Sequence, residues 1–437
     1  MARIEVLQVL TSNALADLLA TLDAATVDNL QEKLLTSTGT PSSELQSVQK
    51  LAELLPTTVN AELQTQFLSL IRLVKALCRL TIKYVGVITA DPDNVKALLA
   101  LDDNLLPILR VLKAFVARLG DQDLDEAVYS DKGLLQWLPF VLASCSFVES
   151  GELPGADLMQ SVAVVGDVLD ECSALLKLDR GSVLAKYVGQ IVALCSQDVD
   201  KEQWVSAKSI NKKIMLRVVE QVPFPHLGGD LLGRLLALTF PLVDDLTDAT
   251  QLVGARLLRH IVHNVTPTEL RWYSDVLMEV LHTAIVTRKP ATLDTLLDCL
   301  VESLDKVSPL GELKHYERFV PRLLSDTSLC SEVAVRVVFV RHLRVIVGHL
   351  GAPHSLAVIR YLQPLLKVLI AGFESINIEL LVETLGSLHG TILAAWPRIA
   401  PHTEQILVGV LRAVAFCELF EAEMPTGPGA GYHNWYS

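Results

Sequence analysis

GARLLRHIVHNVTPTELRWYSDVLMEVLHTAI, residues 254–285, contains two apolar helical patterns separated by a short polar turn. In the first pattern, apolar residues recur every three or four positions at Leu257, Leu258, Ile261 and Val262, which predicts one buried face of an amphipathic helix. The turn NVTPTE then interrupts the pattern before it resumes. Two amphipathic helices of this kind cannot bury their apolar faces alone, so they must stack on neighbouring helices.

The same pattern continues along most of the chain, where short stretches such as ITADPDN, QVPFPHLGG and TRKPAT interrupt it. The pattern predicts roughly 18 helices, which in the second half pair with a period near ~40 residues, the length of HEAT or armadillo repeats. The predicted pairs are 227–241 with 246–265, 267–287 with 291–306, and 353–372 with 376–395. We therefore predict an all-α protein, an α-solenoid of HEAT/armadillo-like helical repeats.

Composition supports stacked helices and suggests three regions. Of the 437 residues, 51% are apolar but only 5% are aromatic, and the apolar excess is mostly Leu, Val and Ala. We expect divergent helical repeats in 1–215, more regular repeats in 216–420 and a flexible tail in 421–437, with a further flexible break at 38–46.

Charge and cysteine usage exclude several classes of partner. With 50 acidic and 37 basic residues the net charge is −13, which disfavours nucleic-acid binding because that needs a basic surface. The seven cysteines are widely spaced without a C-x-x-C pair, as expected of reduced, buried thiols. The first residues do not resemble a signal peptide, and no apolar run is long enough to span a membrane. We expect a soluble intracellular protein that binds neither nucleic acid nor membrane.

Motifs of catalysis and metal binding are missing or incomplete. The sequence contains no G-x-S-x-G, H-E-x-x-H, P-loop or kinase signature, and its eleven histidines are scattered. Asp121, Asp123 and Asp125 are spaced like calcium ligands, but Glu126 replaces the required glycine and Lys132 replaces the final glutamate. We expect no enzymatic activity, no cofactor and no metal.

Four polar residues, Arg256, Arg259, His260 and His263, lie opposite the apolar face of the helix at 246–265. A metal site built on the two histidines is disfavoured because the two guanidinium groups would repel a cation. These four residues therefore form either a solvated ridge or a partner-binding ridge, and both interpretations remain open.

A second charged feature lies in the stretch FLSLIRLVKALCRLTIKYVG, where Arg72, Lys75, Arg79 and Lys83 align along one helix face. The stripe is either a solvated surface or a docking surface for an acidic partner or anionic lipid.

The region 215–415 resembles the Tti2-type family, whose members are subunits of the TTT co-chaperone complex. One match is in the motif that joins QVPFPHL, an Asp-Asp loop and G…LLRHIVHNV, and another is LLVETLGSLHGTILAAWPRIAPHTEQILVGVLRAV. The matching positions are Gln221, Val222, Pro225, Leu227, Asp244, Asp245, Gly254, Leu258, His260 to Val262, Asn264, Val265, Trp396, Pro397 and Arg398. The chain departs from the family at Leu246, where a tyrosine usually follows the Asp-Asp loop, and the first 200 residues match only in being helical.

The resemblance implies a non-enzymatic scaffold of the cytoplasm and nucleus that binds Tti1-type and Tel2-type subunits. Through them it would support the maturation and stability of phosphatidylinositol-3-kinase-related kinases, such as mTOR, ATM and ATR, with the Hsp90 chaperone. The alternative is another HEAT-repeat adaptor or scaffold, of the transport or phosphatase type.

The partner-binding hypothesis places contacts at helix turns and exposed helix faces, where solenoids bind. Trp396 at a helix end would be a second anchor, because large aromatic side chains are common interface hot spots. The alternative for the Asp-Asp turn is helix capping. The candidate contact residues are Asp244, Asp245, Arg256, Arg259, His260, His263, Trp396, Pro397 and Arg398.

Overall fold

The structure is a computed structural model that describes residues 14–22, 27, 30, 34, 43–90, 95–120, 130–149, 160–197, 199–206, 209–309, 312–351, 355–375 and 377–423. All regular secondary structure in these ranges is helical, which confirms the predicted all-α fold of stacked helices. None of these helices is long and apolar enough to cross a membrane. The chain forms two compact units, unit 1 (Met1–Val265) and unit 2 (Thr266–Ser437). The boundary expected near residue 215 rests on sequence alone and stays a prediction.

Unit 1 is built around a helix that is apolar on all sides. Its helices include α2 (Ala14–Thr21), α4 (Ser43–Leu54), η1 (Leu55–Thr57), α5 (Asn60–Ala90), α6 (Val95–Leu119), α8 (Asp131–Leu134), α9 (Leu138–Glu149), α10 (Gln160–Leu176), α11 (Arg180–Ser196), α12 (Lys201–Val205), α13 (Ile210–Glu220), α14 (Asp230–Val243) and α15 (Asp248–His263). Helix α9 packs against α5, α10, α11 and α13, and all of its residues from Val141 to Val148 are buried. Just before α9, the fully buried Trp137 ring meets the Phe115 ring edge-on, with 5.0 Å between centroids.

The last two helices of unit 1, α14 and α15, pack closely at one glycine. A Cβ atom on Gly254 would lie 2.6 Å from the backbone carbon of Leu242 and 2.6 Å from the backbone nitrogen of Val243. No side chain fits at this distance, so the glycine sets how closely the two helices approach.

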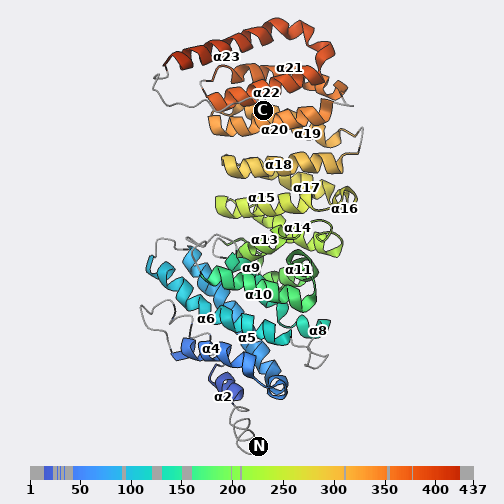
Figure 1. Cartoon of the computed structure of the whole chain (residues 1–437). Helices are drawn as coiled ribbons and strands as arrows, with labels where there is room; N and C mark the ends of the chain where they lie inside the picture. The colour runs from blue at the N-terminus through green and yellow to red at the C-terminus, as the bar shows by residue number, and fades with distance from the viewer. Residues whose placement is uncertain are drawn as a thin grey trace, which may run out of the picture. The chain divides into compact units, whose positions relative to one another are not determined.

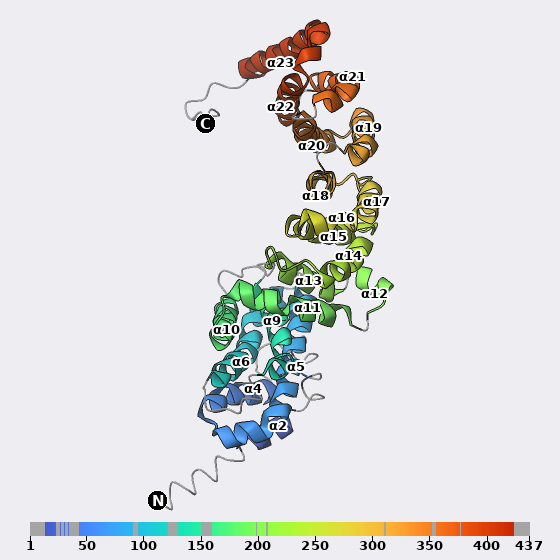
Figure 2. The ribbon, with the colours of Figure 1, turned by 90° about the vertical axis from the view of Figure 1, so that its right-hand side faces the viewer.

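Unit 2 is a regular stack of helices that follow one another in chain order (Figure 1). Its helices include α16 (Pro267–Arg271), α17 (Ser274–Ala284), α18 (Pro290–Val307), α19 (Lys314–Leu329), α20 (Val333–Gly351), α21 (Ser355–Gly372), α22 (Ile378–Ala394), η3 (Trp396–Arg398), η4 (Ala400–His402) and α23 (Thr403–Glu423). Helices α18, α20 and α22 form one layer, and α17, α19 and α21 form the other, with α23 packed on α21 (Figure 2).

Ion pairs between successive helices of one layer of unit 2 reproduce the predicted repeat length. The paired residues lie 38 to 43 positions apart in the chain. These pairs are Lys314 with Asp275, Arg318 with Glu279, Arg360 with Glu317, and Arg412 with Glu374. Equivalent positions of neighbouring repeats therefore lie side by side, as expected for repeats of about 40 residues.

The predicted single helix at 267–287 is wrong, because the structure divides it into α16 and α17. Helix α16 begins with a capping box, in which Thr266 and Glu269 each bond to the other's backbone N–H. The helix ends at Arg271 with Trp272 as its C-cap, and Tyr273 then leaves helical geometry with φ −108° and ψ 6°. The other two predicted helix pairs are present and correspond to α14 with α15 and to α21 with α22.

Candidate partner-binding surfaces

The Asp-Asp turn connects α14 to α15 and is held by one of its own carboxylates. Oδ1 of Asp245 accepts a hydrogen bond of 2.8 Å from the backbone N–H of Thr247, the N-cap residue of α15. Helix α15 begins at Asp248, slightly later than the sequence predicts, so Asp245 fixes the turn in front of the helix. Leu246, between these residues, is 100% exposed.

Asp245 also acts on a buried lysine that sequence reasoning missed. Lys212 of α13 is only 2% exposed, and its ammonium group donates to the carbonyls of Val205 and Ser206, both at 2.9 Å, and to Oγ1 of Thr250 at 2.8 Å. Burial lowers the pKa of Lys212, and the Asp245 carboxylate opposes that shift. The lysine thus joins α12, α13 and α15, and no local pattern predicts it because its partners are distant in the chain.

The ridge predicted on α15 is divided by its contact with α13. Arg256 pairs with Glu220, with 2.7 Å between Nη2 and Oε1, and Nε2 of His260 lies 3.0 Å from the carbonyl oxygen of Val222. Arg259 and His263 are exposed. Arg256 and His260 are therefore engaged by the preceding helix and turn, and a partner-binding role of the ridge stays a prediction.

Asn264 extends this contact and explains much of the motif that carries the family resemblance. Its Oδ1 accepts a 2.9 Å hydrogen bond from the backbone N–H of Phe224, and its Nδ2 donates to the carbonyl of His260. Val222 and Leu227, in the turn after α13, are fully buried. The two parts of the motif therefore bind each other, and they stabilise the fold of unit 1.

In unit 2, Trp396, Pro397 and Arg398 form η3 directly after α22, and all three are exposed. Trp396 is 74% exposed and ends an apolar stripe along the outer side of α22. Its residues, Ile378, Val382, Leu385, Leu393 and Trp396, lie along one face, which the exposed His389 interrupts between Leu385 and Leu393.

Helix α23 carries a second apolar stripe. Its inner side packs on α21, where a Cβ on Gly409 would lie 2.8 Å from the Phe373 ring. Its opposite side exposes Leu407, Leu411 and Val414, one helical turn apart, with Leu411 64% exposed. Within the described part of the chain nothing covers this apolar stripe.

Comparison with known proteins finds one informative relative. The chain is similar to human TELO2-interacting protein 2, with 23% identity over 237 residues, which are 51% of this chain and 46% of that protein. The match thus spans about half the length of the relative. No known protein-family profile matches the chain. An engineered protein of known structure is similar over 84% of this chain and 98% of its own, with a TM-score of 0.37 and 15% identity.

The candidate residues therefore form two separate groups. Asp244, Asp245 and the α15 residues belong to unit 1, whereas η3 belongs to unit 2. Sequence reasoning found Trp396 but missed the apolar stripes beside it. The signal was present, because the segment from Ile406 to Val414 is apolar on both sides of a helical wheel.

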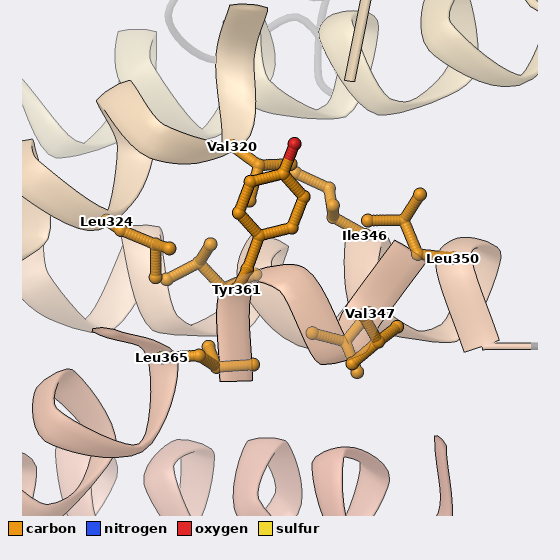
Figure 3. A pocket seen from close by; sticks show the side chains of 9 residues that line it. Val320, Leu324, Ile346, Val347, Leu350, Tyr361 and Leu365 are labelled. Carbon is orange, nitrogen blue, oxygen red and sulfur yellow. The ribbon is translucent and has the colours of Figure 1, made fainter. Parts of the chain in front are cut away.

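One cavity that the described residues outline is small and apolar. It lies between α19, α20 and α21, with the Tyr361 ring among aliphatic side chains (Figure 3). Its volume is about 10 Å³, room for roughly one water molecule. The cavity is lined by Val320, Leu324, Leu343, Ile346, Val347, Leu350, Val358, Tyr361 and Leu365. Such a lining offers no polar group to orient a substrate or cofactor except the tyrosine hydroxyl.

Buried cysteine thiols in unit 1 are poor nucleophiles. Burial raises the pKa of Cys78 and of Cys172 to about 12, so both stay protonated at neutral pH. Among the described residues, no three His, Cys, Asp or Glu side chains gather as a metal site would require. The calcium-like loop with Asp121, Asp123 and Glu126 lies outside the described residues.

Proposed function

We propose that this chain is a non-enzymatic scaffold subunit of a TTT-type co-chaperone complex, and a member of the Tti2-type family. In this role it binds Tti1-type and Tel2-type subunits in the cytoplasm and nucleus. The assembled complex then supports the maturation of phosphatidylinositol-3-kinase-related kinases with Hsp90. The similarity to TELO2-interacting protein 2, together with the matched motif residues, supports this assignment over other HEAT-repeat scaffolds.

The apolar outer face of α23 is the observation that carries the proposed role. Leu407, Leu411 and Val414 remain exposed at the end of a helical stack, and Trp396 lies just before the same helix. Burying a leucine side chain contributes about 1.5–3 kcal/mol, so three aliphatic residues and a tryptophan can anchor a stable interface. The partner surface that fits is an apolar helix face of another helical-repeat subunit.

Co-purification of the full-length chain with its partners tests the proposal. Leu407→Glu with Leu411→Glu places two charges on the outer face of α23, and we expect recovery of the Tti1-type subunit to fall about 30-fold or more, as hot-spot losses of about 2 kcal/mol or more imply. The matched control is Val286→Glu with Leu329→Glu, since both residues are exposed aliphatics elsewhere in unit 2. The control should bind as wild type does.

One result would refute the family assignment, and another would refute the α23 interface alone. If the wild-type chain recovers neither TTT subunit, the family role fails. If the α23 variant melts at the wild-type temperature and still retains both subunits, α23 is not the interface.

The turn and ridge of unit 1 are tested in the same assay, and we expect them to contribute less. The variants are Asp244→Lys, Asp245→Lys, Arg259→Glu and, as the unit 2 comparison, Trp396→Ala. Because Asp245 has a structural role, its variant requires a melting curve before its binding is compared.

A further inference from the structure

A basic stripe lies on the surface of α5 in unit 1. Arg72, Arg79 and Lys83 are exposed, and Lys75 between them is half-buried. The Phe140 ring at the start of α9 lies beneath two of them, with 5.2 Å from its centroid to Nζ of Lys75 and 5.6 Å to Cζ of Arg79. Cations at this distance are attracted to the face of an aromatic ring, which fixes the direction of the two side chains.

Unlike several other basic side chains of the protein, the four cations of this stripe are not paired with an acidic side chain in the described part of the chain. Arg256, Arg318 and Arg341, for example, each pair with a carboxylate within 3.2 Å. Among the residues that the structure describes, no carboxylate lies within 4 Å of the four cations of the stripe. Burial, and then the positive charge of Arg79, lower the pKa of Lys75, as expected where cations crowd without a counter-charge.

The spacing of the stripe suits one kind of ligand. Its charges follow one another by three or four residues, which corresponds to about 4.5–6 Å along a helix. In an extended peptide, alternate side chains lie about 6.6–7 Å apart on the same side. Acidic side chains at every second position of an extended segment can therefore meet successive cations of the stripe.

Two other anionic ligands fit this surface less well. A bilayer-binding helix also inserts a broad apolar face, whereas here the exposed apolar residues are Leu68 and Val87, one at each end of the stripe. The net charge of −13 also repels anionic membranes and nucleic acids, and a duplex needs a wider basic surface. A short acidic segment avoids most of that repulsion, since it touches only the stripe.

We propose that the α5 stripe formed by Arg72, Lys75, Arg79 and Lys83 binds an extended acidic segment of a partner polypeptide, with carboxylates on alternate residues. This docking site is independent of α23, so loss of binding at one surface leaves the other intact.

Fluorescence anisotropy with the full-length chain tests this proposal. The probe is a labelled peptide of alternating glutamate and alanine, compared with a peptide of alternating glutamine and alanine, in about 50 mM salt where charges are weakly screened. We expect only the glutamate peptide to bind. The triple variant Arg72→Glu, Arg79→Glu and Lys83→Glu should weaken binding about 10-fold or more, because three ion pairs become repulsive.

The control carries the same change of charge at other exposed positions, as Lys201→Glu, Arg271→Glu and Arg288→Glu, and should bind the peptide nearly as wild type does. Arg79→Gln with Lys83→Gln, a milder change, should give an intermediate loss and guards against misfolding of the triple variant. Equal binding by the stripe and control variants, or no binding by wild type, overturns the proposal. Capture on vesicles of phosphatidylserine and phosphatidylcholine that requires the stripe, without peptide binding, would assign the stripe to membranes instead.

Discussion

Helices α9 and α23 are both rich in apolar residues but have opposite surroundings. The sequence of α9 is LPFVLASCSFVE, and that of α23 is TEQILVGVLRAVAFCELFEAE, which also contains Arg412 and several glutamates. In unit 1, α9 is enclosed by α5, α10, α11 and α13, whereas in unit 2 α23 packs on α21 and exposes its other side. Apolar residues that recur at helical spacing are normally buried. The difference leaves the outer side of α23 uncovered within the described part of the chain.

The strongest test of this comparison is to place the same charge on both helices. Val141 of α9 is fully buried and Val414 of α23 is about half exposed. We expect Val141→Asp to lower the free energy of unfolding by more than about 4 kcal/mol, since it buries an unpaired carboxylate. Val414→Asp should change it by no more than about 0.5 kcal/mol. Urea denaturation followed by circular dichroism measures both, and similar losses would contradict the comparison.

A second prediction concerns covered and open glycines. Gly254→Ala forces a methyl group against the α14 backbone, and we expect a loss of about 1–3 kcal/mol. A Cβ atom on Gly348 of α20 would meet no other atom within 4 Å, so Gly348→Ala should stabilise the chain by up to about 1 kcal/mol through helix propensity. Melting temperatures that shift in opposite directions for the two variants would support this packing, and shifts of the same sign would refute it.

Covered and open positions also differ within a single helix, α15. His260 bonds to the carbonyl of Val222, so His260→Ala should cost about 1 kcal/mol. His263 is exposed, and His263→Ala should stay within about 0.5 kcal/mol. Chemical denaturation of the two variants side by side resolves this difference. Equal changes in the free energy of unfolding would indicate that His260 is solvated, as His263 is.

The smallest expected effect is a pH dependence from two histidines of unit 2. Burial, and then Arg322, lower the pKa of His282, while burial, and then Lys314, lower the pKa of His315. Because the folded pKa values lie below the unfolded value of about 6.5, the unfolded chain binds more protons in acid, and stability falls as the pH drops below that value. Melting temperatures measured from about pH 7.5 to about pH 5.5 should decline. The decline should be shallower in a His282→Gln, His315→Gln double variant.

Much of the fold could be predicted from the sequence because helices leave a periodic signal. The spacing of Leu257, Leu258 and Ile261 predicts their burial, and all three are fully buried. The break at Trp272 was missed, since no proline or glycine marks it. Lys212 was missed for a different reason, because its burial depends on acceptors brought together only by tertiary packing.

The candidate surfaces were harder to predict, because a helical wheel shows which face is polar but not which neighbour covers it. His260 lies on the polar face of α15, yet the turn after α13 engages it. Gly254 and Asn264 belong to the motif that suggested a function, and the structure gives them roles in packing and hydrogen bonding. Leu407 and Leu411 have the residue type and spacing of core positions, and only the place of α23 at the end of the stack shows that they are open.

The contrast between the buried and exposed cysteines has a practical consequence for labelling chemistry. Cys78, Cys145, Cys172, Cys195 and Cys299 are all buried, whereas Cys417 is exposed on α23, one turn beyond Val414. Cys330 is partly exposed, so in a Cys330→Ser variant a maleimide added briefly at neutral pH should react first at Cys417. Slower alkylation of this thiol in the presence of a bound subunit would report directly on occupation of α23.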